Sequence, residues 1–456
     1  MIAPTKEPEW SSRTGFILAT VGSAVGIGSI WKFPYEVGAN GGGAFVLAYL
    51  LGLALVVLPL MLAELALGRR GNADAAASIA NAAVAEGRSH RWQVIGALGA
   101  LTAFLILSYY SVIGGWAVSY AIDTAIDGLP DASQTATTDR FDRLLASPAK
   151  MFLFQGLFLG AVAAVVGRGV QRGIETAMKL LMPLLGVLLV LLAMYSLGVG
   201  EATETLRFLF VPDTDRLTAR GLLDALGLGF FSIGVGLGLL ITYAAYARPD
   251  IDLRTVAVVS IGADTAISIV AGLAVFPVVF ANGLDPAEGP GLVFVALPLA
   301  FAAMPAGRVA ATAFFALLVI AAFGSAVSML EGAVAPLERV RGWSRRRSAI
   351  VASLACWATG TISVLSFNRW KDVRLLGSLD RYTDATPFDL LDELTSNLLL
   401  PLGGLALALF TGWVISDRLL SEELVAGRRT LAVLRGMLRF VVPLAIVAVG
   451  AVSLAG

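Results

Sequence analysis

The sequence predicts an all-α polytopic membrane protein, folded as one transmembrane domain over residues 1–456. Hydrophobic residues make up 57% of the chain and charged residues only 14%, whereas a soluble globular chain carries about 25% charged residues. The apolar residues gather in runs of about 20, the length that a helix needs to cross a hydrocarbon core about 30 Å thick. Alternating strand patterns of about ten residues are missing from the sequence, which excludes a transmembrane β-barrel.

The charged and metal-binding residues exclude several classes of function. Lys and Arg number 33, as do Asp and Glu, so the chain has no net charge to attract nucleic acid. A single cysteine, Cys356, and a single histidine, His90, exclude an internal disulfide and a Cys- or His-based metal cluster. Glu64, Asp264 and Glu331 are isolated acids within apolar spans and do not make up the catalytic set of a membrane enzyme. We therefore expect no enzyme activity, no nucleic-acid partner and no obligatory protein partner.

Eleven apolar spans are expected along the chain. They cover residues 12–38, 43–68, 92–124, 150–167, 173–198, 221–247, 255–282, 306–336, 348–367, 389–416 and 431–454. Residues 283–305 are rich in Gly, Pro and Phe and are expected to form a re-entrant or surface loop, while 125–149 and 368–388 are expected to be polar loops. The first ten residues are polar, so we expect no cleavable signal peptide.

The distribution of Lys and Arg predicts the orientation in the membrane. With the N-terminus inside, the cytoplasmic segments carry 19 of the 33 basic residues and the outer loops carry 11, while Lys32, Arg435 and Arg439 lie within spans. Positively charged loops tend to remain inside. We therefore expect a cytoplasmic N-terminus, and the odd number of spans then places the C-terminus outside.

Spans 1 and 6 are glycine-rich at their centres. They contain GSAVGIGS (22–29) and GLGFFSIGVGLG (227–238), and each begins a block of five spans. An odd number of spans per block gives the two blocks, about 12–198 and 221–416, opposite topology, with 431–454 as an extra helix. Interrupted helices at matching positions of inverted repeats indicate the binding site of a secondary transporter. The alternative reading is that these glycines are positions of close helix packing.

Five segments of the chain resemble the neurotransmitter:sodium symporter family, in its prokaryotic amino-acid transporter branch. They are SSRTGFILATVGSAVGIGSIWKFPYEVGANGGGAF (11–45), LSYYSVIGGW (107–116), FFSIGVGLGLLITYAAY (230–246), AAFGSAVSMLEG (321–332) and DLLDELTSNLLLPLGG (389–404). Gly173 and Pro183 also fit a glycine-x9-proline pattern of bacterial members. The resemblance implies a leucine-transporter-like fold with helices 1 and 6 interrupted. It also implies Na⁺-coupled amino-acid uptake by alternating access across the plasma membrane of a prokaryote.

The resemblance also implies where an amino-acid substrate would bind. Its carboxylate would meet the backbone N–H groups of Gly26, Ile27 and Gly28, because a helix N-terminus favours an anion. The hydroxyl of Tyr110 would bind the same carboxylate.

The amine and the side chain of the substrate would lie further along the two breaks. The amine would meet carbonyls around Ala24, Phe231 and Ser232. Gly234 and Leu237 replace larger residues of the leucine transporter, which predicts a medium to large hydrophobic or aromatic substrate. The residues expected to line the side-chain pocket are Val25, Ile106, Phe231, Gly234, Leu237, Ser325 and Met329.

Two Na⁺ sites are implied, the first of them beside the substrate carboxylate. Its matching ligands are the Ala24 carbonyl, Ser29, Ser232 and Asp264. An acid in the middle of a span costs at least about 2.5–3.5 kcal/mol unless it is partnered, so Asp264 is a functional candidate from the sequence alone. A protonatable Asp264 also keeps open a proton-coupled or Na⁺-independent transporter of the same fold.

The second ion site matches less completely, so we expect one or two Na⁺ ions. Its ligands would be the carbonyls of Gly22, Val25 and Ala321 together with the Ser325 hydroxyl. Gly324 stands where the family has Ser or Thr, which removes one side-chain oxygen.

Chloride is not expected as a cofactor. Ser268 stands where bacterial relatives supply a glutamate, which alone would favour chloride, but Leu228 occupies the position of a chloride-binding glutamine. Asp264 already supplies a negative charge at the site.

The resemblance places a gate on each side of the pocket. The outer gate would pair Lys32 with Asp392, and lysine cannot form the bidentate contact that arginine makes. At the inner gate, Glu7 and Arg339 carry charges opposite to those of the family, which still predicts a pair. Trp10 and Tyr246 match further inner-gate residues.

Overall fold

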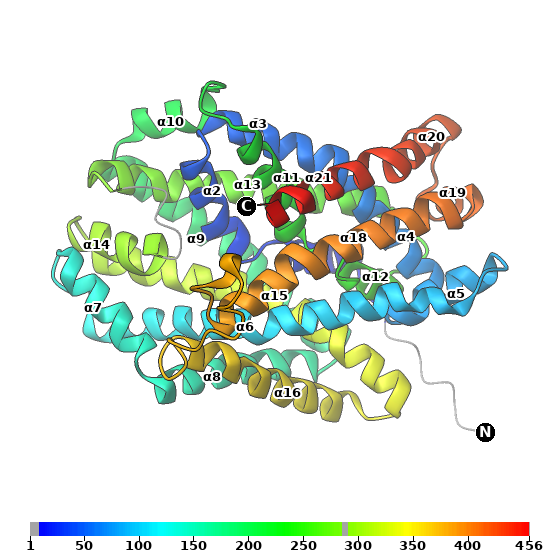
Figure 1. Ribbon diagram of the computed structural model, residues 1–456, viewed down its shortest axis with the longest axis horizontal. Coiled ribbons are helices and arrows are strands. Elements are labelled where there is room, and N and C mark those ends of the chain that lie inside the picture. The colour runs from blue at the N-terminus through cyan, green and yellow to red at the C-terminus, as the bar shows by residue number, and fades with distance from the viewer. Residues whose placement is uncertain (1–8, 285–290, 456) are drawn as a thin grey trace.

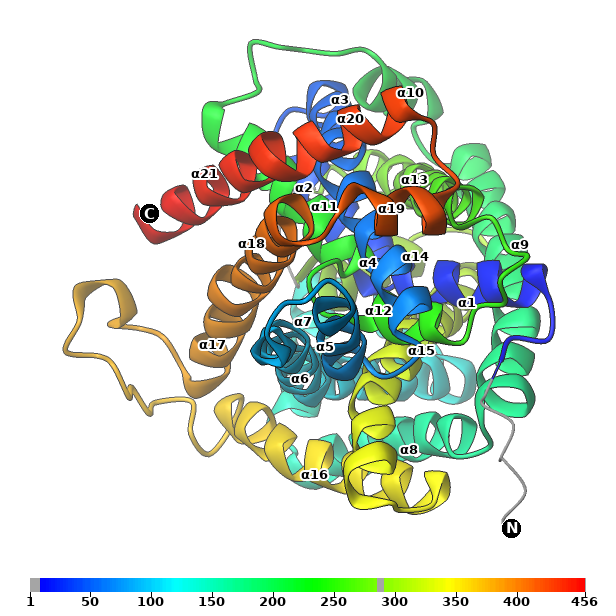
Figure 2. The ribbon, with the colours of Figure 1, turned by 90° about the vertical axis from the view of Figure 1, so that its right-hand side faces the viewer.

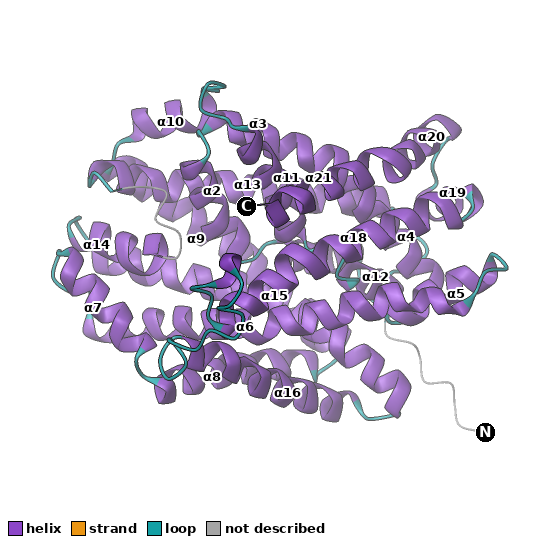
Figure 3. Cartoon of the chain, viewed as in Figure 1, coloured by secondary structure: helices purple, strands orange, loops and turns teal. Residues whose placement is uncertain are grey.

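The computed structural model describes residues 9–284 and 291–455. Within these residues the secondary structure is helical, as Figure 3 shows, and the all-α prediction is confirmed. Short 3₁₀ or π segments, labelled η, continue or join the α-helices.

The first half of the chain contains the elements that correspond to predicted spans 1–5. Their ends lie within a few residues of the predicted ones, because each apolar run ends at Gly, Pro or polar residues. The elements are α1 (Arg13–Ala24), η1 (Gly28–Lys32), α2 (Phe33–Ala39), α3 (Gly43–Gly52), η2 (Leu53–Val57), α4 (Leu58–Gly71), α5 (Ala75–Ala85), η3 (His90–Trp92), α6 (Gln93–Asp127), α7 (Gln134–Leu145), α8 (Pro148–Val166), η4 (Val170–Glu175) and α9 (Thr176–Val199).

The second half contains the elements of predicted spans 6–11. They are α10 (Ala202–Phe210), α11 (Ala219–Ile233), α12 (Leu239–Ala245), α13 (Leu253–Ala281), η5 (Leu292–Ala296), α14 (Leu297–Ala302), α15 (Gly307–Arg341), α16 (Arg345–Ser366), η6 (Asp380–Tyr382), α17 (Pro387–Asp392), η7 (Glu393–Leu399), α18 (Leu400–Leu409), η8 (Phe410–Val414), α19 (Asp417–Leu424), α20 (Arg428–Gly436), η9 (Met437–Val441) and α21 (Val442–Ala455).

Nine helices among the described residues are long and apolar enough to cross a membrane. A tenth crossing is formed if the bent pair of Arg13–Ala24 and Gly28–Ala39 counts as one span. Predicted span 6 differs, because α11 and α12 have only 15 and 7 residues. At 1.5 Å per residue neither helix alone crosses a core about 30 Å thick.

Two predicted loops contain helices instead. The polar segment 125–149 includes α7, whose Phe141 stacks on Phe294, and 283–305 includes η5 and α14. Phe294 is fully buried beside Trp116 and Tyr120. The polar composition of 125–149 and the Gly and Pro residues of 283–305 both indicated loops, but apolar side chains in each segment pack onto the bundle. This packing stabilises short helices that would be marginal alone.

The long helices run roughly side by side along the horizontal axis of Figure 1. Viewed from one end in Figure 2, α4, α12 and α6 lie near the middle, while α9, α16 and the pair α20–α21 lie at the periphery. Helices α6 and α15 pack extensively on each other, and α1 contacts α13, α15 and α9. This arrangement surrounds the interrupted helices with protein.

Candidate functional site

Two helical segments are broken at the glycine-rich stretches, as predicted. α1 ends at Ala24, and Val25 is extended, with φ −75° and ψ 110°. The next helical segment lies at 56° to α1. Residues 234–238 separate α11 from α12, and three glycines there have φ of +71°, +92° and +71°, a conformation that glycine adopts without steric cost. Both breaks leave peptide groups outside the helical hydrogen-bond pattern in the centre of the bundle.

A cavity of about 40 Å³ lies between the two breaks. Tyr110 of α6 reaches it, and its hydroxyl accepts a hydrogen bond from the backbone N–H of Ile27 at 3.1 Å. None of the described residues that line the cavity is charged. The predicted substrate residues that line it are Gly26, Gly28, Ile106, Tyr110, Phe231, Ser232, Gly234, Leu237, Ser325 and Met329.

Three predicted substrate residues do not line this cavity. Ile27 lines a neighbouring cavity together with Lys32 and Asp392. Ala24 and Val25 are buried at the end of α1 and line neither cavity. The cavity thus has hydroxyl and peptide groups at the break in helix 1 and apolar side chains around the rest of its wall. Such a wall fits a small zwitterion that carries an apolar side chain.

Asp264 lies fully buried within α13 and accepts hydrogen bonds from three hydroxyl groups. The Ser29 oxygen is 2.5 Å from Oδ1, and the Ser232 oxygen is 3.1 Å from both carboxylate oxygens. The Tyr49 hydroxyl is 3.0 Å from Oδ2. Three of the side chains predicted for the first Na⁺ site therefore converge, and Oδ1, Oδ2 and two serine oxygens form a compact set of the hard oxygen atoms that suit an alkali cation.

The residues predicted for the second ion site are also close to one another. The Ser325 hydroxyl donates toward the carbonyls of Ser23 and Val25, each at 3.2 Å. A Cβ atom added at Gly324 would lie 2.5 Å from the carbonyl oxygen of Gly22. The chain therefore brings α15 unusually near α1 at the position where a second hydroxyl would be needed.

A second cavity, of about 260 Å³, adjoins the first on the side of Lys32 and Asp392. Gly28, Tyr110 and Phe231 line both cavities and so stand between them. The predicted outer-gate residues, Lys32 and Asp392, both line the larger cavity.

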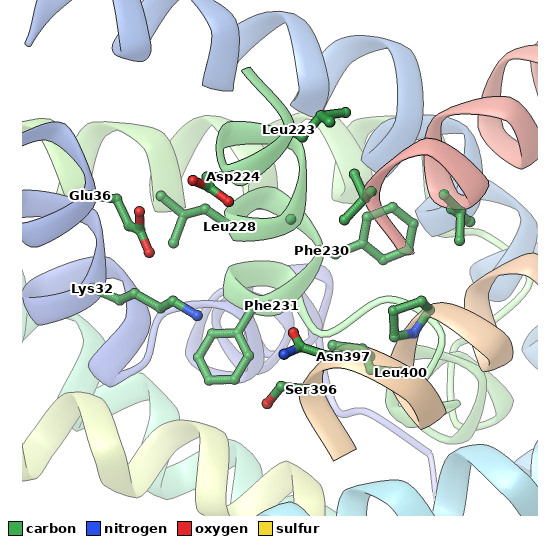
Figure 4. Close-up of a pocket in the computed structure, with 14 residues that line it drawn as sticks. Lys32, Glu36, Leu223, Asp224, Leu228, Phe230, Phe231, Ser396, Asn397 and Leu400 are labelled. Carbon is green, nitrogen blue, oxygen red and sulfur yellow. The ribbon is translucent and has the colours of Figure 1, made fainter. Parts of the chain in front are cut away.

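No ion pair joins Lys32 to Asp392, although the structure describes both residues. The Lys32 ammonium lies 4.6 Å from the centre of the Phe231 ring, and Asp392 accepts a hydrogen bond from Ser396 at 2.8 Å. Figure 4 shows Lys32 pointing toward Phe231, with Glu36 and Asp224 on its other side. A further cavity of about 110 Å³ is lined by Lys32, Glu36, Asp224 and Phe231.

The opposite side of the pocket is closed by Trp10, which is only 1% exposed. Its indole N–H donates to the Tyr243 carbonyl at 2.8 Å, and its backbone N–H donates to the Tyr246 carbonyl at 3.0 Å. The ring packs on Phe16 and Tyr243. Tyr246 in turn donates its hydroxyl hydrogen to Glu331 at 2.8 Å.

Arg339 forms an ion pair with Asp74. The pair expected between Glu7 and Arg339 stays a prediction, because Glu7 lies outside the described residues. Asp74 caps α5, where it accepts a hydrogen bond from Ala77 N–H, and this surface loop gave no signal in the sequence. The charge on Arg339 is thus balanced from α5.

The sequence was compared with those of known proteins. The model of the "Sodium:neurotransmitter symporter family" matches residues 7–143 and 149–454. The chain belongs to this family. An uncharacterized sodium-dependent transporter of Bacillus subtilis, YhdH, is 36% identical over 97% of each chain. An uncharacterized sodium-dependent transporter of Haemophilus influenzae is 32% identical over 96% of each chain.

A solved structure also resembles the protein closely. It is the crystal structure of MhsT in complex with L-phenylalanine, with a TM-score of 0.88 and 42% sequence identity. The likeness covers 98% of this chain and 100% of the other. With these relatives, membership of the symporter family makes the chain a sodium-dependent membrane transporter and not an enzyme.

Sequence reasoning missed several polar residues that lie around this candidate site. Tyr49 gave no signal because it lies in an apolar span, and only the folded structure brings its hydroxyl within 3.0 Å of Asp264. Glu64 was treated as an isolated acid, but its carboxylate accepts the N–H of Gly236 at 2.6 Å, inside the second break. Arg345 belongs to a run of three arginines in the sequence, 345–347, and only the structure shows that it pairs with the buried Glu331.

A serine at Gly324, which would restore the usual family residue, is expected to destabilise the protein. The new Cβ would approach the Gly22 carbonyl to 2.5 Å, and overpacking of this kind costs about 1–3 kcal/mol. We expect Gly324→Ser to lower the melting temperature without increasing the affinity for Na⁺. Gly262→Ser on α13, where an added Cβ meets no atom within 4 Å, is the control. A gain in Na⁺ affinity with unchanged melting temperature would contradict the expectation.

Proposed function

We propose that the protein couples Na⁺ influx to the uptake of a hydrophobic or aromatic amino acid by alternating access. The observation that carries the proposal is the uncharged cavity between two helix breaks, adjacent to the buried Asp264 cluster. Phenylalanine bound to MhsT supports an amino-acid ligand. The same mechanism requires a plasma membrane with a Na⁺ gradient, and we place the N-terminus in the cytoplasm on the basis of the Lys and Arg distribution.

The substrate carboxylate is proposed to bind at the first break. The Ile27 N–H already donates to the Tyr110 hydroxyl, and the positive end of the following helical segment favours an anion. The substrate amine would meet carbonyls at the ends of α1 and α11. Ile106, Leu237 and Met329 supply the apolar wall that selects a hydrophobic side chain.

One Na⁺ ion is proposed to bind between Ser29, Ser232 and Asp264. In the absence of water at this depth, a cation must find its oxygen ligands in the protein and the substrate. The carboxylate of Asp264 and that of the substrate would both contact the ion, which couples the binding of the two. The oxygen atoms of Ser29, Ser232 and Asp264 already lie close together. The ion would replace the hydrogen bonds between the serine hydroxyls and the carboxylate.

A second Na⁺ ion is proposed to bind more weakly than the first. Gly324 lacks a hydroxyl, and its backbone occupies space close to the Gly22 carbonyl. Transport is proposed not to require chloride, because Asp264 provides a fixed negative charge beside the ion.

The two halves of the chain are proposed to rock about the pocket. The outer side has a cavity of about 260 Å³ that reaches Tyr110 and Phe231, whereas Trp10 fills the other side. This difference supports a state closed toward the cytoplasm. Opening on that side requires Trp10 to leave the carbonyls of Tyr243 and Tyr246.

Uptake by proteoliposomes tests the proposed function. Liposomes that contain the purified protein should accumulate labelled phenylalanine or leucine when the Na⁺ concentration is higher outside than inside. They should not do so when K⁺ replaces Na⁺. Replacement of chloride by gluconate should leave the rate unchanged. Uptake driven by a proton gradient without Na⁺ would instead favour the proton-coupled alternative, for which the buried carboxylate of Asp264 is the motivating observation. A screen in which only glycine or glutamate binds would overturn the substrate proposal.

Tyr110→Phe is expected to raise the KM for the amino acid by about 10- to 100-fold. The variant loses a hydroxyl beside the Ile27 N–H, and hydrogen bonds to charged groups contribute about 1.5–3 kcal/mol. The adjacent Tyr109→Phe is a matched control, because the Tyr109 hydroxyl contacts Thr395 and Ser396 outside the small cavity. Equal effects of the two substitutions on KM would argue against carboxylate binding by Tyr110.

A further inference from the structure

An apolar groove of about 760 Å³ runs between α8 and α16, far from the transport pocket. The two helices lie next to each other along the lower edge of the molecule in Figures 1 and 2. They are antiparallel, since the Arg345 guanidinium near the start of α16 donates to the Val166 carbonyl at the end of α8. The wall on α8 is made of small residues, which leave the space open: a Cβ added at Gly160 would meet no atom within 4 Å.

Two arginines line one end of this groove. Arg168 follows α8 and Arg346 lies in the first turn of α16, and a Cβ added at Gly167 would be 3.8 Å from the Cα of Arg346. Both arginines are exposed, and neither forms an ion pair with a carboxylate of the described chain. No described acidic residue lines the groove. The last carbonyls of α8 are capped by the N–H groups of residues 167–169, while the start of α16 adds the positive end of a helix dipole.

A buried hydroxyl group lies deeper in the groove. Ser353 lines it and is 7% exposed, and its hydroxyl has no hydrogen-bond partner among the described residues. Serine within a helix commonly bonds to the carbonyl four residues earlier, so an unpartnered hydroxyl here calls for an external acceptor. Ser353 lies seven residues after Arg346, which is about 10 Å along a helix.

The depths of these groups match those of a phospholipid. The headgroup region of a bilayer leaflet is about 5–8 Å thick outside the hydrocarbon core. Because Arg346 and Ser353 are separated by about 10 Å along α16, a phosphate held at the level of Arg346 places the glycerol esters, which lie inside the headgroup region, toward the level of Ser353. Ile350, between these two residues in the sequence, and Leu354 and Trp357, after them, continue the apolar wall.

We propose that this groove binds one anionic phospholipid. Arg168 and Arg346 bind the phosphate, Ser353 donates to an ester carbonyl, and an acyl chain lies along the glycine-rich face of α8. The paired arginines at only one end of an apolar groove favour this occupant over a second copy of the chain, which would have to bring acidic residues to the same place. The site is separate from the proposed transport pocket, so the binding of lipid can be measured whether or not transport occurs.

Native mass spectrometry of the full-length protein, released from detergent with added phosphatidylglycerol, tests the proposal. We expect one phosphatidylglycerol to remain bound, phosphatidylcholine to bind at least tenfold more weakly, and inorganic phosphate not to displace the lipid. Arg168→Gln with Arg346→Gln should weaken the binding at least tenfold. Arg347→Gln is the matched control, since Arg347 belongs to the same basic run but lies against Trp343 outside the groove.

Filling the groove gives a second test that does not involve charge. Gly160→Phe should abolish phosphatidylglycerol binding, whereas Gly186→Phe on α9, where an added Cβ also meets no atom within 4 Å, should not. All variants are compared by melting temperature, so a loss that follows from unfolding is recognised. Equal lipid binding by the arginine variants and the Arg347 control would overturn the proposal. If the unsubstituted protein is a dimer in the same spectra, and Gly160→Phe abolishes the dimer without changing lipid binding, the groove binds a second copy of the chain and the lipid proposal is overturned.

Discussion

Asp264→Asn is expected to raise the Na⁺ concentration needed for half-maximal uptake by at least about 100-fold in chloride-free medium. Two unit charges about 4 Å apart interact by about 4 kcal/mol at an effective dielectric constant near 20, and each 1.4 kcal/mol is a factor of ten in affinity. Asparagine keeps the shape of the side chain and one oxygen, so the change removes mainly the charge. Because the Ser29, Tyr49 and Ser232 hydroxyls would remain in place, added chloride is expected to restore part of the uptake.

The measurement is the Na⁺ dependence of amino-acid uptake in chloride and in gluconate. Asp224→Asn is the control, because Asp224 lines the outermost space beside Lys32 and lies away from the Asp264 cluster. It should change the Na⁺ dependence by less than a few fold. Unchanged Na⁺ affinity in Asp264→Asn without chloride would show that the ion binds elsewhere.

Glu331→Gln is expected to shift the protein toward a state that is open at Trp10. Glu331 is fully buried and holds both the Tyr246 hydroxyl and the Arg345 guanidinium. Removing one partner of a buried ion pair costs about 3–5 kcal/mol. The substitution therefore destabilises the closed state, because Arg345 would keep its charge there without the carboxylate of Glu331.

The opening can be followed by the accessibility of an introduced cysteine. Ala245 is 6% exposed and lies beside Tyr246, and the natural cysteine, Cys356, is buried. We expect Glu331→Gln to increase the labelling rate of Ala245→Cys by at least about tenfold. Glu338→Gln is the control, because Glu338 also pairs with Arg345 but has a side chain that is 30% exposed, where a pair is worth about 0–1 kcal/mol. Equal labelling in both variants would contradict a closing role for Glu331.

The helix breaks and the buried acid proposed to bind the first ion could be predicted because their signals are local. Glycines clustered inside an apolar span indicate a backbone that leaves the helix, and an acid inside an apolar span requires partners. Asp264 was recognisable in this way without any structure. The resemblance to the symporter family then assigned Ser29 and Ser232 to the same site, and their hydroxyls lie 3.2 Å apart in the structure.

The partners of these groups could not be predicted, because packing alone brings them together. Tyr49 and Asp264 are 215 residues apart in sequence, and Arg339 and Asp74 are 265 apart. A tyrosine in an apolar span or an aspartate at a helix start has an ordinary packing or capping role in most proteins. Arg339 illustrates the difficulty, since the sign of its charge indicates that an acidic partner exists without indicating that Asp74 is one.

The attachment of Trp10 to main-chain carbonyls determines which substitutions can release it. The acceptors are the main-chain carbonyls of residues 243 and 246, which remain whatever side chain stands there. A substitution at either position therefore cannot remove an acceptor, whereas a substitution of Trp10 removes the indole donor while leaving the residues that line the small cavity unchanged.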